Sequence, residues 1–178
     1  MKKKQIYFIV QAALIAAIYA AATYIAAILN LAYGQIQFRF SEALNILALF
    51  TPAAIPGLSI GCLIANLGSP YGAIDIVLGT LATLLSSLAI YYIARPLKRV
   101  GPYLAPLFPT LFNAVIIGFE ITMFLPKGAG WTAFLLSAGQ VGLGEAVVCF
   151  ALGIPLYYII KGRYPNLFRF LSNKKKRG

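Results

Sequence analysis

Long apolar runs, separated by short polar or turn-forming stretches, are the main pattern along the chain. The first run, Ile6–Leu29, follows three lysines and is long enough to cross a bilayer as a helix. A secretory signal peptide also begins with positive charge, but this run is long enough to span and no clear cleavage site follows it. The pattern therefore predicts a first transmembrane helix over Ile6–Leu29.

Prolines divide the next apolar region, which follows a polar and aromatic stretch over 30–41 that we interpret as an extracytoplasmic loop. Pro52 and Pro56 lie in the middle of this region, and prolines at that spacing disfavour one continuous helix. We therefore predict a hairpin of two helices, over 42–50 and 53–67. Nine helical residues cover only about 14 Å, so the pattern leaves open whether the first of the two crosses the membrane.

Three longer apolar runs follow, and each predicts a span: 73–94, 104–125 and 131–160. The second has its prolines only in the first turns, where proline is tolerated. The third is long for one crossing and contains Gly153 and Pro155, so a tilt, a kink or a break is expected. In total, the pattern predicts an all-α integral membrane protein with six transmembrane helices.

The distribution of basic residues predicts the orientation of these helices. Six helices place both termini on one side, and every basic residue except Arg39 and Lys127 then falls on that side, within 2–4, 95–99 and 161–177. The positive-inside rule therefore predicts that the N- and C-termini are cytoplasmic. Membrane topology and contact with anionic lipid explain the net charge of +11, so we expect no nucleic-acid partner.

Composition supports this architecture and excludes other classes of protein. Of the 178 residues, 61% are hydrophobic and only 11% are charged, against about 25% in soluble domains, which excludes a soluble enzyme. The chain has no histidine, and Cys62 and Cys149 lie far apart in apolar stretches, so we expect no metal site, no cofactor and no catalytic Cys–His or Ser–His pair. We expect a single transmembrane domain over 1–162 in the plasma membrane and a basic cytoplasmic tail over 163–178.

The chain's four carboxylates all lie in, or at the edge of, apolar segments: Glu42, Asp75, Glu120 and Glu145. A carboxylate within a span costs at least about 2.5–3.5 kcal/mol on insertion scales, so such residues are functional candidates. The alternative is a structural ion pair or a protonated acid bonded to a backbone carbonyl. For Asp75 the favourable position of an acid at a helix N-terminus is a sufficient structural explanation. A local Arg39–Glu42 pair, with Ser41 capping the short helix, is an equally weighted alternative for Arg39.

Several of these polar residues come from separate predicted helices, mostly toward the extracytoplasmic side or at mid-depth, which predicts one solute pocket open to the outside. Its proposed lining is Arg39, Glu42, Asn45, Asn113, Glu120, Gln140 and Glu145, with Asn66, Asp75 and Trp131 as further candidates. Asn66 has the simpler alternative role of ending its helix, and Trp131 that of an interfacial anchor. Because carboxylates outnumber the one arginine, the pocket suits a solute rich in hydrogen-bond donors or carrying an amine, rather than an anion.

The first predicted helix carries two adjacent rows of small residues at four-residue spacing: Ala12, Ala16 and Ala20, and Ala13, Ala17 and Ala21. Such rows form a smooth face, which serves either close packing within the protein or docking to another membrane protein. The chain has no GxxxxGK[ST] phosphate-binding loop. Active transport would therefore draw its energy from a partner or from an ion gradient.

Four segments resemble the QueT family, namely 38–44 (FRFSEAL), 50–57 (FTPAAIPG), 75–83 (DIVLGTLAT) and 141–146 (VGLGEA). The predicted size, helix number and alanine-rich first helix are also similar to those of a substrate-binding S component of an energy-coupling factor (ECF) transporter. The resemblance covers nearly all of 6–161. It implies uptake of a queuosine precursor, a 7-deazaguanine such as queuine or 7-aminomethyl-7-deazaguanine. It also implies a complex with two ATP-binding subunits and one transmembrane coupling subunit, to which the alanine face docks.

The candidate residues fit such a substrate. A guanine-like edge presents a ring N–H and an amino group, which a carboxylate accepts as a pair. We expect Glu145 or Glu120 to bind this edge, with Asn113 and Gln140 as amide partners, and Glu42 to bind the amine. Two alternatives stay open: a self-sufficient secondary transporter in which Glu120 or Glu145 relays protons, and a structural or assembly factor whose pocket is empty.

Overall fold

The computed structural model describes residues 3–34, 36–125, 130–165 and 167–168. Every regular element within these ranges is helical, which confirms the all-α prediction. Most of the predicted 126–130 turn and of the basic tail over 163–178 lies outside the described residues.

Four stretches of the described chain are long and apolar enough to cross a membrane, which supports the membrane prediction. The first is α1 (Lys3–Ile28). The second joins α3 (Ala73–Ala89) to the π-helix η2 (Ile90–Ala94) and the short 3-10 helix η3 (Arg95–Leu97), and the third joins α4 (Gly101–Leu104) to α5 (Leu107–Met123). The fourth consists of α6 (Gly130–Val148), the π-helix η4 (Cys149–Gly153) and α7 (Ile154–Arg163).

Two shorter apolar helices form the predicted hairpin. The 3-10 helix η1 spans Phe40–Leu49, and α2 spans Ala54–Asn66, with the break at Pro52. At about 2 Å per residue, a 3-10 helix of ten residues is about 20 Å long, which is less than the hydrocarbon thickness of about 30 Å. Seven of its residues are buried, so η1 packs inside the bundle.

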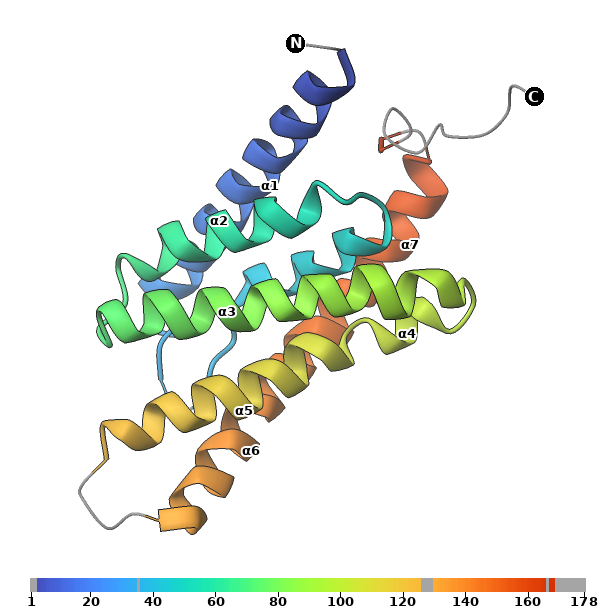
Figure 1. Cartoon of the computed structure of the whole chain (residues 1–178). Coiled ribbons are helices and arrows are strands. Elements are labelled where there is room, and N and C mark those ends of the chain that lie inside the picture. The colour runs from blue at the N-terminus through green and yellow to red at the C-terminus, as the bar shows by residue number, and fades with distance from the viewer. Residues whose placement is uncertain (1–2, 35, 126–129, 166, 169–178) are drawn as a thin grey trace.

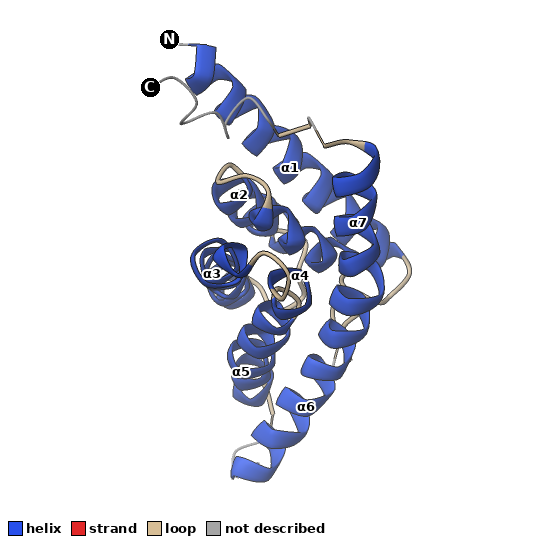
Figure 2. Ribbon diagram, turned by 90° about the vertical axis from the view of Figure 1, so that its right-hand side faces the viewer, coloured by secondary structure: helices blue, strands red, loops and turns tan. Residues whose placement is uncertain are grey.

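The break expected in the last span is present as η4. This π-helix lies directly before Pro155, whose ring and missing N–H disturb the hydrogen bonds of the preceding turn. Figure 2 shows α6 and α7 running through this element as one long column beside α5.

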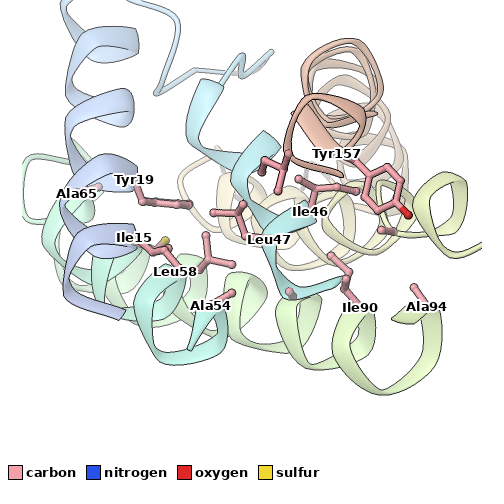
Figure 3. Close-up of a cluster of buried hydrophobic side chains, with 14 residues drawn as sticks. Ile15, Tyr19, Ile46, Leu47, Ala54, Leu58, Ala65, Ile90, Ala94 and Tyr157 are labelled. Carbon is pink, nitrogen blue, oxygen red and sulfur yellow. The ribbon is translucent and has the colours of Figure 1, made fainter. Parts of the chain in front are cut away.

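Each long helix packs against the next one, and η1 lies among them. Contacts join α1 to α2, α2 to α3, α3 to α5 and α5 to α6, while η1 contacts α1, η2 and η4 (Figures 1 and 2). Figure 3 shows the resulting core, in which Ile46 and Leu47 of η1 lie among Tyr19, Leu58 and Tyr157 from three other helices.

Side-chain contacts distinguish the two ends of the bundle. At one end, the Thr51 hydroxyl donates to the Gln11 side-chain carbonyl at 3.1 Å, beside the turn between η1 and α2. At the other end, the phenol groups of Tyr24 and Tyr33 donate to the carbonyl oxygens of Ile64 and Ala65, each at 2.8 Å. The loop after α1 therefore folds over the end of α2.

Small residues set the close approach of α1 to α2. A Cβ placed on Gly57 would lie 2.8 Å from the Ala12 carbonyl oxygen, and one on Gly61 would lie 2.8 Å from that of Ala16. These distances are too short for a methyl group. The contact between the two helices therefore depends on glycine at four-residue spacing in α2, facing alanine at the same spacing in α1.

Candidate functional site

The Glu42 carboxylate lies at the centre of the bundle, where η1 brings it against α1 and α5. The Tyr19 hydroxyl donates to its Oε1, and the amide groups of Asn45 and Asn113 donate to its Oε2 at 2.7 and 3.4 Å. All four side chains are buried. The structure thus brings together three residues that the sequence placed in one pocket, and adds Tyr19.

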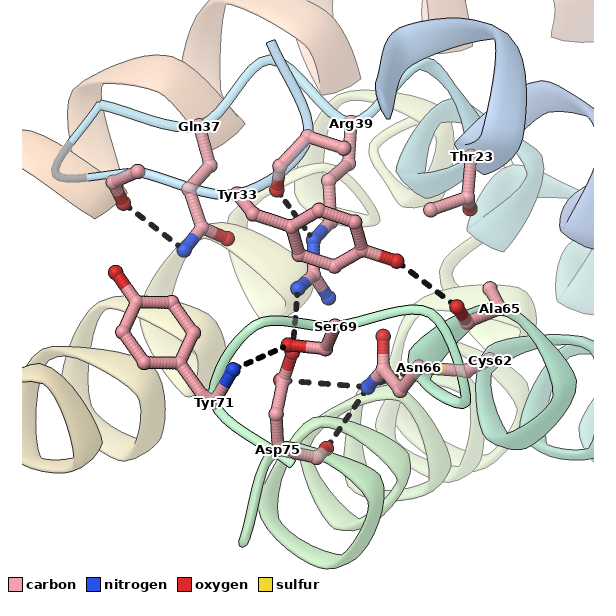
Figure 4. A network of polar contacts seen from close by, with 12 residues as sticks. Thr23, Tyr33, Gln37, Arg39, Cys62, Ala65, Asn66, Ser69, Tyr71 and Asp75 are labelled. Carbon is pink, nitrogen blue, oxygen red and sulfur yellow. Dashed lines mark hydrogen bonds and ion pairs between the residues drawn. The ribbon is translucent and has the colours of Figure 1, made fainter. Parts of the chain in front are cut away.

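A second polar cluster forms at the end of the bundle beside the loop after α1 (Figure 4). The Arg39 guanidinium forms an ion pair with Asp75 at 3.3 Å and donates from Nε to the Ala32 carbonyl at 3.0 Å. The Asn66 amide, at the end of α2, donates to the backbone carbonyl of Asp75 at 2.8 Å and to its carboxylate at 3.3 Å. Asn66 therefore connects the end of α2 to the start of α3.

This arrangement corrects one interpretation of Arg39. The sequence allowed a local pair with Glu42 and a cap from Ser41, but the ion pair of Arg39 is with Asp75, and no side chain caps η1. The Ser41 hydroxyl instead accepts a hydrogen bond from Thr23 of α1 at 2.7 Å. The physical reason is the folding of the loop, which carries Arg39 to the start of α3.

The Asp75 carboxylate keeps the buried Arg39 guanidinium positively charged. Burial by itself would lower the pKa of the guanidinium, but the Asp75 carboxylate raises it, and the net shift is upward. The guanidinium also lies over the Tyr33 ring, with its carbon 5.1 Å from the ring centroid. Burial raises the pKa of the Tyr33 phenol, so Tyr33 stays neutral.

Glu120 is buried at the same end of the bundle, and neither of its carboxylate oxygens has a hydrogen-bond partner among the described residues. Tyr71, in the turn between α2 and α3, lies near Glu120, and its ring packs on that of Phe124 with centroids 5.2 Å apart. Burial raises the pKa of Tyr71, and the nearby carboxylates of Asp75 and Glu120 raise it further. Glu120 therefore lies within electrostatic reach of the Arg39–Asp75 pair.

Glu145 is a buried residue of α6. The Cys149 thiol, one turn later, donates to its carboxylate at 3.8 Å. A cavity of about 10 Å³, large enough for about one water molecule, is lined by Glu42, Asn45 and Cys149. A Cβ on Gly144 would overlap the backbone of Gln37, so glycine there lets the loop pack beside Glu145.

The buried side-chain atoms that lack a partner in the described part of the chain are mainly hydrogen-bond acceptors. Among the described residues, the buried side-chain atoms without a partner are Asn45 Oδ1, Asn66 Oδ1, Thr80 Oγ1 and both oxygens of Glu120. Only the Thr80 hydroxyl is also a donor. A group of buried acceptors with net negative charge is suited to a solute that supplies several N–H donors.

Two of the sequence candidates lie apart from both clusters. Trp131, at the start of α6, is 79% exposed and packs on the Phe134 ring, as expected of an interfacial anchor. Gln140 is half-buried on α6. In the described part of the chain, no hydrogen bond connects either residue to the clusters.

Sequence reasoning missed Tyr19, which donates to Glu42, and Thr23, which donates to Ser41. Tyr19 is one of eleven tyrosines in the chain, and residue type alone does not distinguish it from the others. The only signal was the four-residue spacing from Tyr19 to Thr23, which places both on one face of α1.

The two alanine rows of α1 have different environments. Ala12, Ala16 and Ala20 are buried and lie on the side of the helix that faces α2. Ala13, Ala17 and Ala21 are exposed. Close packing within the protein therefore accounts for the first row, whereas the second row is the one accessible to a partner.

Comparisons with known proteins agree on one family. A family model described as "QueT transporter" matches residues 9–162. The chain is also 37% identical over 150 residues to the queuosine precursor transporter QueT of Lactococcus lactis subsp. cremoris (strain MG1363), a match that covers 82% of this chain and 87% of that protein. No solved structure matches the chain.

Proposed function

Since the chain belongs to the QueT transporter family, we propose that it is a membrane-embedded importer of a queuosine precursor, a 7-deazaguanine base such as queuine or 7-aminomethyl-7-deazaguanine. The relative with 37% identity is a queuosine precursor transporter by name. The family is one of transporters, which agrees with the expectation that the chain is not an enzyme.

The observation that carries the substrate proposal is the set of unpartnered acceptors. Among the described residues, neither carboxylate oxygen of the buried Glu120 has a hydrogen-bond partner. The guanine edge of a 7-deazaguanine presents a ring N–H beside an exocyclic NH₂, which matches the two oxygens of one carboxylate. Glu42 and Glu145 already accept hydrogen bonds from protein donors. Glu120 is therefore the carboxylate we assign to the base edge.

Glu42 is the residue we assign to the amine of an aminomethylated base. Its carboxylate has three protein donors, and the Asn113 contact, at 3.4 Å, is the longest of the three. An ammonium group entering there would replace Asn113, whose amide is then free to bind the ring carbonyl. Glu145, which has only a weak thiol donor, is an additional acceptor at this position.

A purified sample would test this assignment by calorimetry. The protein in nanodiscs is titrated with 7-aminomethyl-7-deazaguanine and with 7-deazaadenine, which lacks the ring N–H and the amino group of the guanine edge. We expect binding of the first and at least about tenfold weaker binding of the second. Equal affinity for both, or no binding of any 7-deazaguanine, would contradict the proposal.

For the transport cycle, the proposal is an ECF-type importer in the plasma membrane with six transmembrane segments and both termini cytoplasmic. Two ATP-binding subunits and one transmembrane coupling subunit would supply the energy. Two observations support it: the chain has no phosphate-binding loop of its own, and the Ala13, Ala17 and Ala21 row is exposed and smooth.

The second candidate function is a self-sufficient secondary transporter, and the observation that favours it is the same buried Glu120. An unpaired carboxylate in a transmembrane segment is a suitable proton carrier. Uptake of the labelled base in cells that lack the ECF module separates the two. Loss of uptake supports the ATP-driven importer, whereas proton-dependent uptake that persists supports the secondary transporter.

A further inference from the structure

A cavity of about 450 Å³ lies at the end of the bundle opposite to the Arg39–Asp75 pair. Asp75 lies near the start and Arg95 near the end of the helical stretch Ala73–Leu97, and the twenty residues between them correspond to about 30 Å. The lining includes Leu49, Phe50, Arg95, Lys98, Tyr157 and Lys161, which come from η1, the turn between α3 and α4, and α7. Its volume is within the range of small-molecule sites, about 300–1,000 Å³.

The cavity is lined by three cations, and none of them forms an ion pair within the described part of the chain. Arg95, Lys98 and Lys161 lie on its wall. All four acidic side chains of the sequence lie elsewhere: Glu42, Asp75, Glu120 and Glu145. Among the residues that the structure describes, no acidic side chain neutralises these three cations, which favours an anionic ligand.

Aromatic rings hold two of the cations at the cavity. The Arg95 guanidinium carbon lies 4.6 Å from the centroid of the Tyr91 ring, and the Lys161 Nζ lies 5.4 Å from that of Tyr157. Contact with a ring face orients a cation but leaves N–H donors available for an anion. The two side chains are thus positioned by ring contacts that do not themselves use the N–H donors.

The turn between α3 and α4 is folded tightly, which places Arg95 and Lys98 on the same cavity. A Cβ on Gly101 would overlap the Ala94 carbonyl oxygen, so glycine is required for this approach. Lys98 has φ +38°, a backbone conformation that residues other than glycine rarely adopt. Strained backbone of this kind persists only where the surrounding structure holds it.

The remaining wall is apolar. The Phe50 and Tyr157 rings pack with centroids 5.1 Å apart, and Leu49 lies beside them. A site with cations on one side and aliphatic and aromatic groups on the other suits an anion attached to an apolar body. Basic pockets between transmembrane helices near the membrane surface bind anionic lipid headgroups.

We propose that this cavity binds a phosphate group, carried either by an anionic phospholipid in the membrane or by a soluble phosphate ester. Arg95 and Lys161 contact the phosphate oxygens, and Lys98 closes the site from the exposed side. The apolar wall contacts the glycerol and the first carbons of an acyl chain when the source is a lipid.

The test uses the full-length protein in detergent and native mass spectrometry with added phosphatidylglycerol. The variant Arg95→Gln/Lys98→Gln/Lys161→Gln removes the three cations of the cavity. The control Lys4→Gln/Arg99→Gln/Arg163→Gln removes three other basic groups, which do not line it. We expect the first variant to bind phosphatidylglycerol at least about tenfold more weakly and the control to bind it like the wild type.

Competition with glycerol 3-phosphate distinguishes the two sources. Displacement of the lipid by the soluble ester at comparable concentration assigns the site to soluble phosphates, and retention of the lipid assigns it to the membrane. Equal loss in both variants would show non-specific attraction, and no loss in either would show that the cavity binds no phosphate. Both results overturn the proposal.

Folding of the triple variant is monitored by thermal unfolding. If that variant does not fold, Lys98→Gln alone, at an exposed position, replaces it. The expected result is then a loss of about threefold, with Arg99→Gln as its control. Equal affinity of these two single variants would also overturn the proposal.

Discussion

Arg39 and Asp75 form a buried ion pair at 3.3 Å although they are 36 residues apart in the sequence. The pair joins the loop after α1 to the first turn of α3, and Asn66 adds the end of α2 to the same contact. Three segments of the chain therefore meet at one carboxylate. The contacts of Arg39, Asp75 and Asn66 hold these segments together at the end of the bundle where Glu120 lies.

Asp75→Asn would leave the Arg39 charge buried without a partner. Removal of one partner of a buried ion pair is strongly destabilising, so we expect a loss of about 3 kcal/mol or more in the free energy of unfolding. Thermal unfolding in detergent measures the effect. The matched control is Arg39→Gln/Asp75→Asn, which removes both charges and should be less damaging than the single change. A single variant as stable as the wild type would show that the pair does not hold the loop.

Glu120→Gln tests the carboxylate assigned to the base edge. The substitution replaces one acceptor oxygen with an NH₂ donor, which faces the donors of the guanine edge, so we expect affinity to fall at least about tenfold, or about 1.4 kcal/mol. Stability should not fall, because the carboxylate has no partner to lose among the described residues. Thr122→Val, at a half-buried position of the same helix where the hydroxyl donates to the Phe119 carbonyl, is the control. Unchanged affinity in folded Glu120→Gln would remove Glu120 from the site.

Ala17→Leu and Ala16→Leu separate docking from packing in α1. Ala16 is buried against α2, where a Cβ on Gly61 would lie only 2.8 Å from the Ala16 carbonyl oxygen. Leucine at position 16 should therefore cost about 1–3 kcal/mol in the free energy of unfolding through overpacking. Ala17 is exposed, so Ala17→Leu should leave unfolding and ligand affinity unchanged while reducing uptake in cells. Normal uptake by the Ala17→Leu protein would show that this row is not a docking surface.

Gly144→Ala probes the contact between the loop and α6. A methyl group there would overlap the Gln37 backbone, so we expect the loop to move away and the free energy of unfolding to fall by more than about 1 kcal/mol. Gly139→Ala is the control, since nothing lies within 4 Å of its Cβ position. That change should stabilise the helix by about 0.5–1 kcal/mol through its higher helix propensity. Equal effects of the two changes on thermal unfolding would contradict the close contact at Gly144.

The helical segments could be predicted from the sequence because apolar runs and prolines act locally. The division at Pro52 and the break before Pro155 are both present, as the turn between η1 and α2 and as η4. The type of helix was not predictable in the same way. Phe40–Leu49 is a 3-10 helix because it is short and packed on all sides, and its neighbours decide its conformation.

The candidate residues could be found because placing a carboxylate in an apolar membrane segment costs free energy, so each such residue requires an explanation. The partner of each carboxylate was not predictable. Arg39 is three residues from Glu42, yet it pairs with Asp75, because the loop folds over α2 and α3. Likewise, both alanine rows of α1 are alike in sequence, and only the position of Gly57 and Gly61 decides which one is buried.

The sequence by itself determined that this protein is a helical membrane protein with a small set of isolated polar groups, since the energy of burying apolar and charged groups depends mainly on residue type. Only the tertiary structure decided which of these groups meet. Glu42 has three donors, Asp75 has Arg39, and Glu120 has no partner among the described residues. That difference arises because hydrogen bonds act over about 3 Å, and such distances between helices depend on how the whole bundle packs.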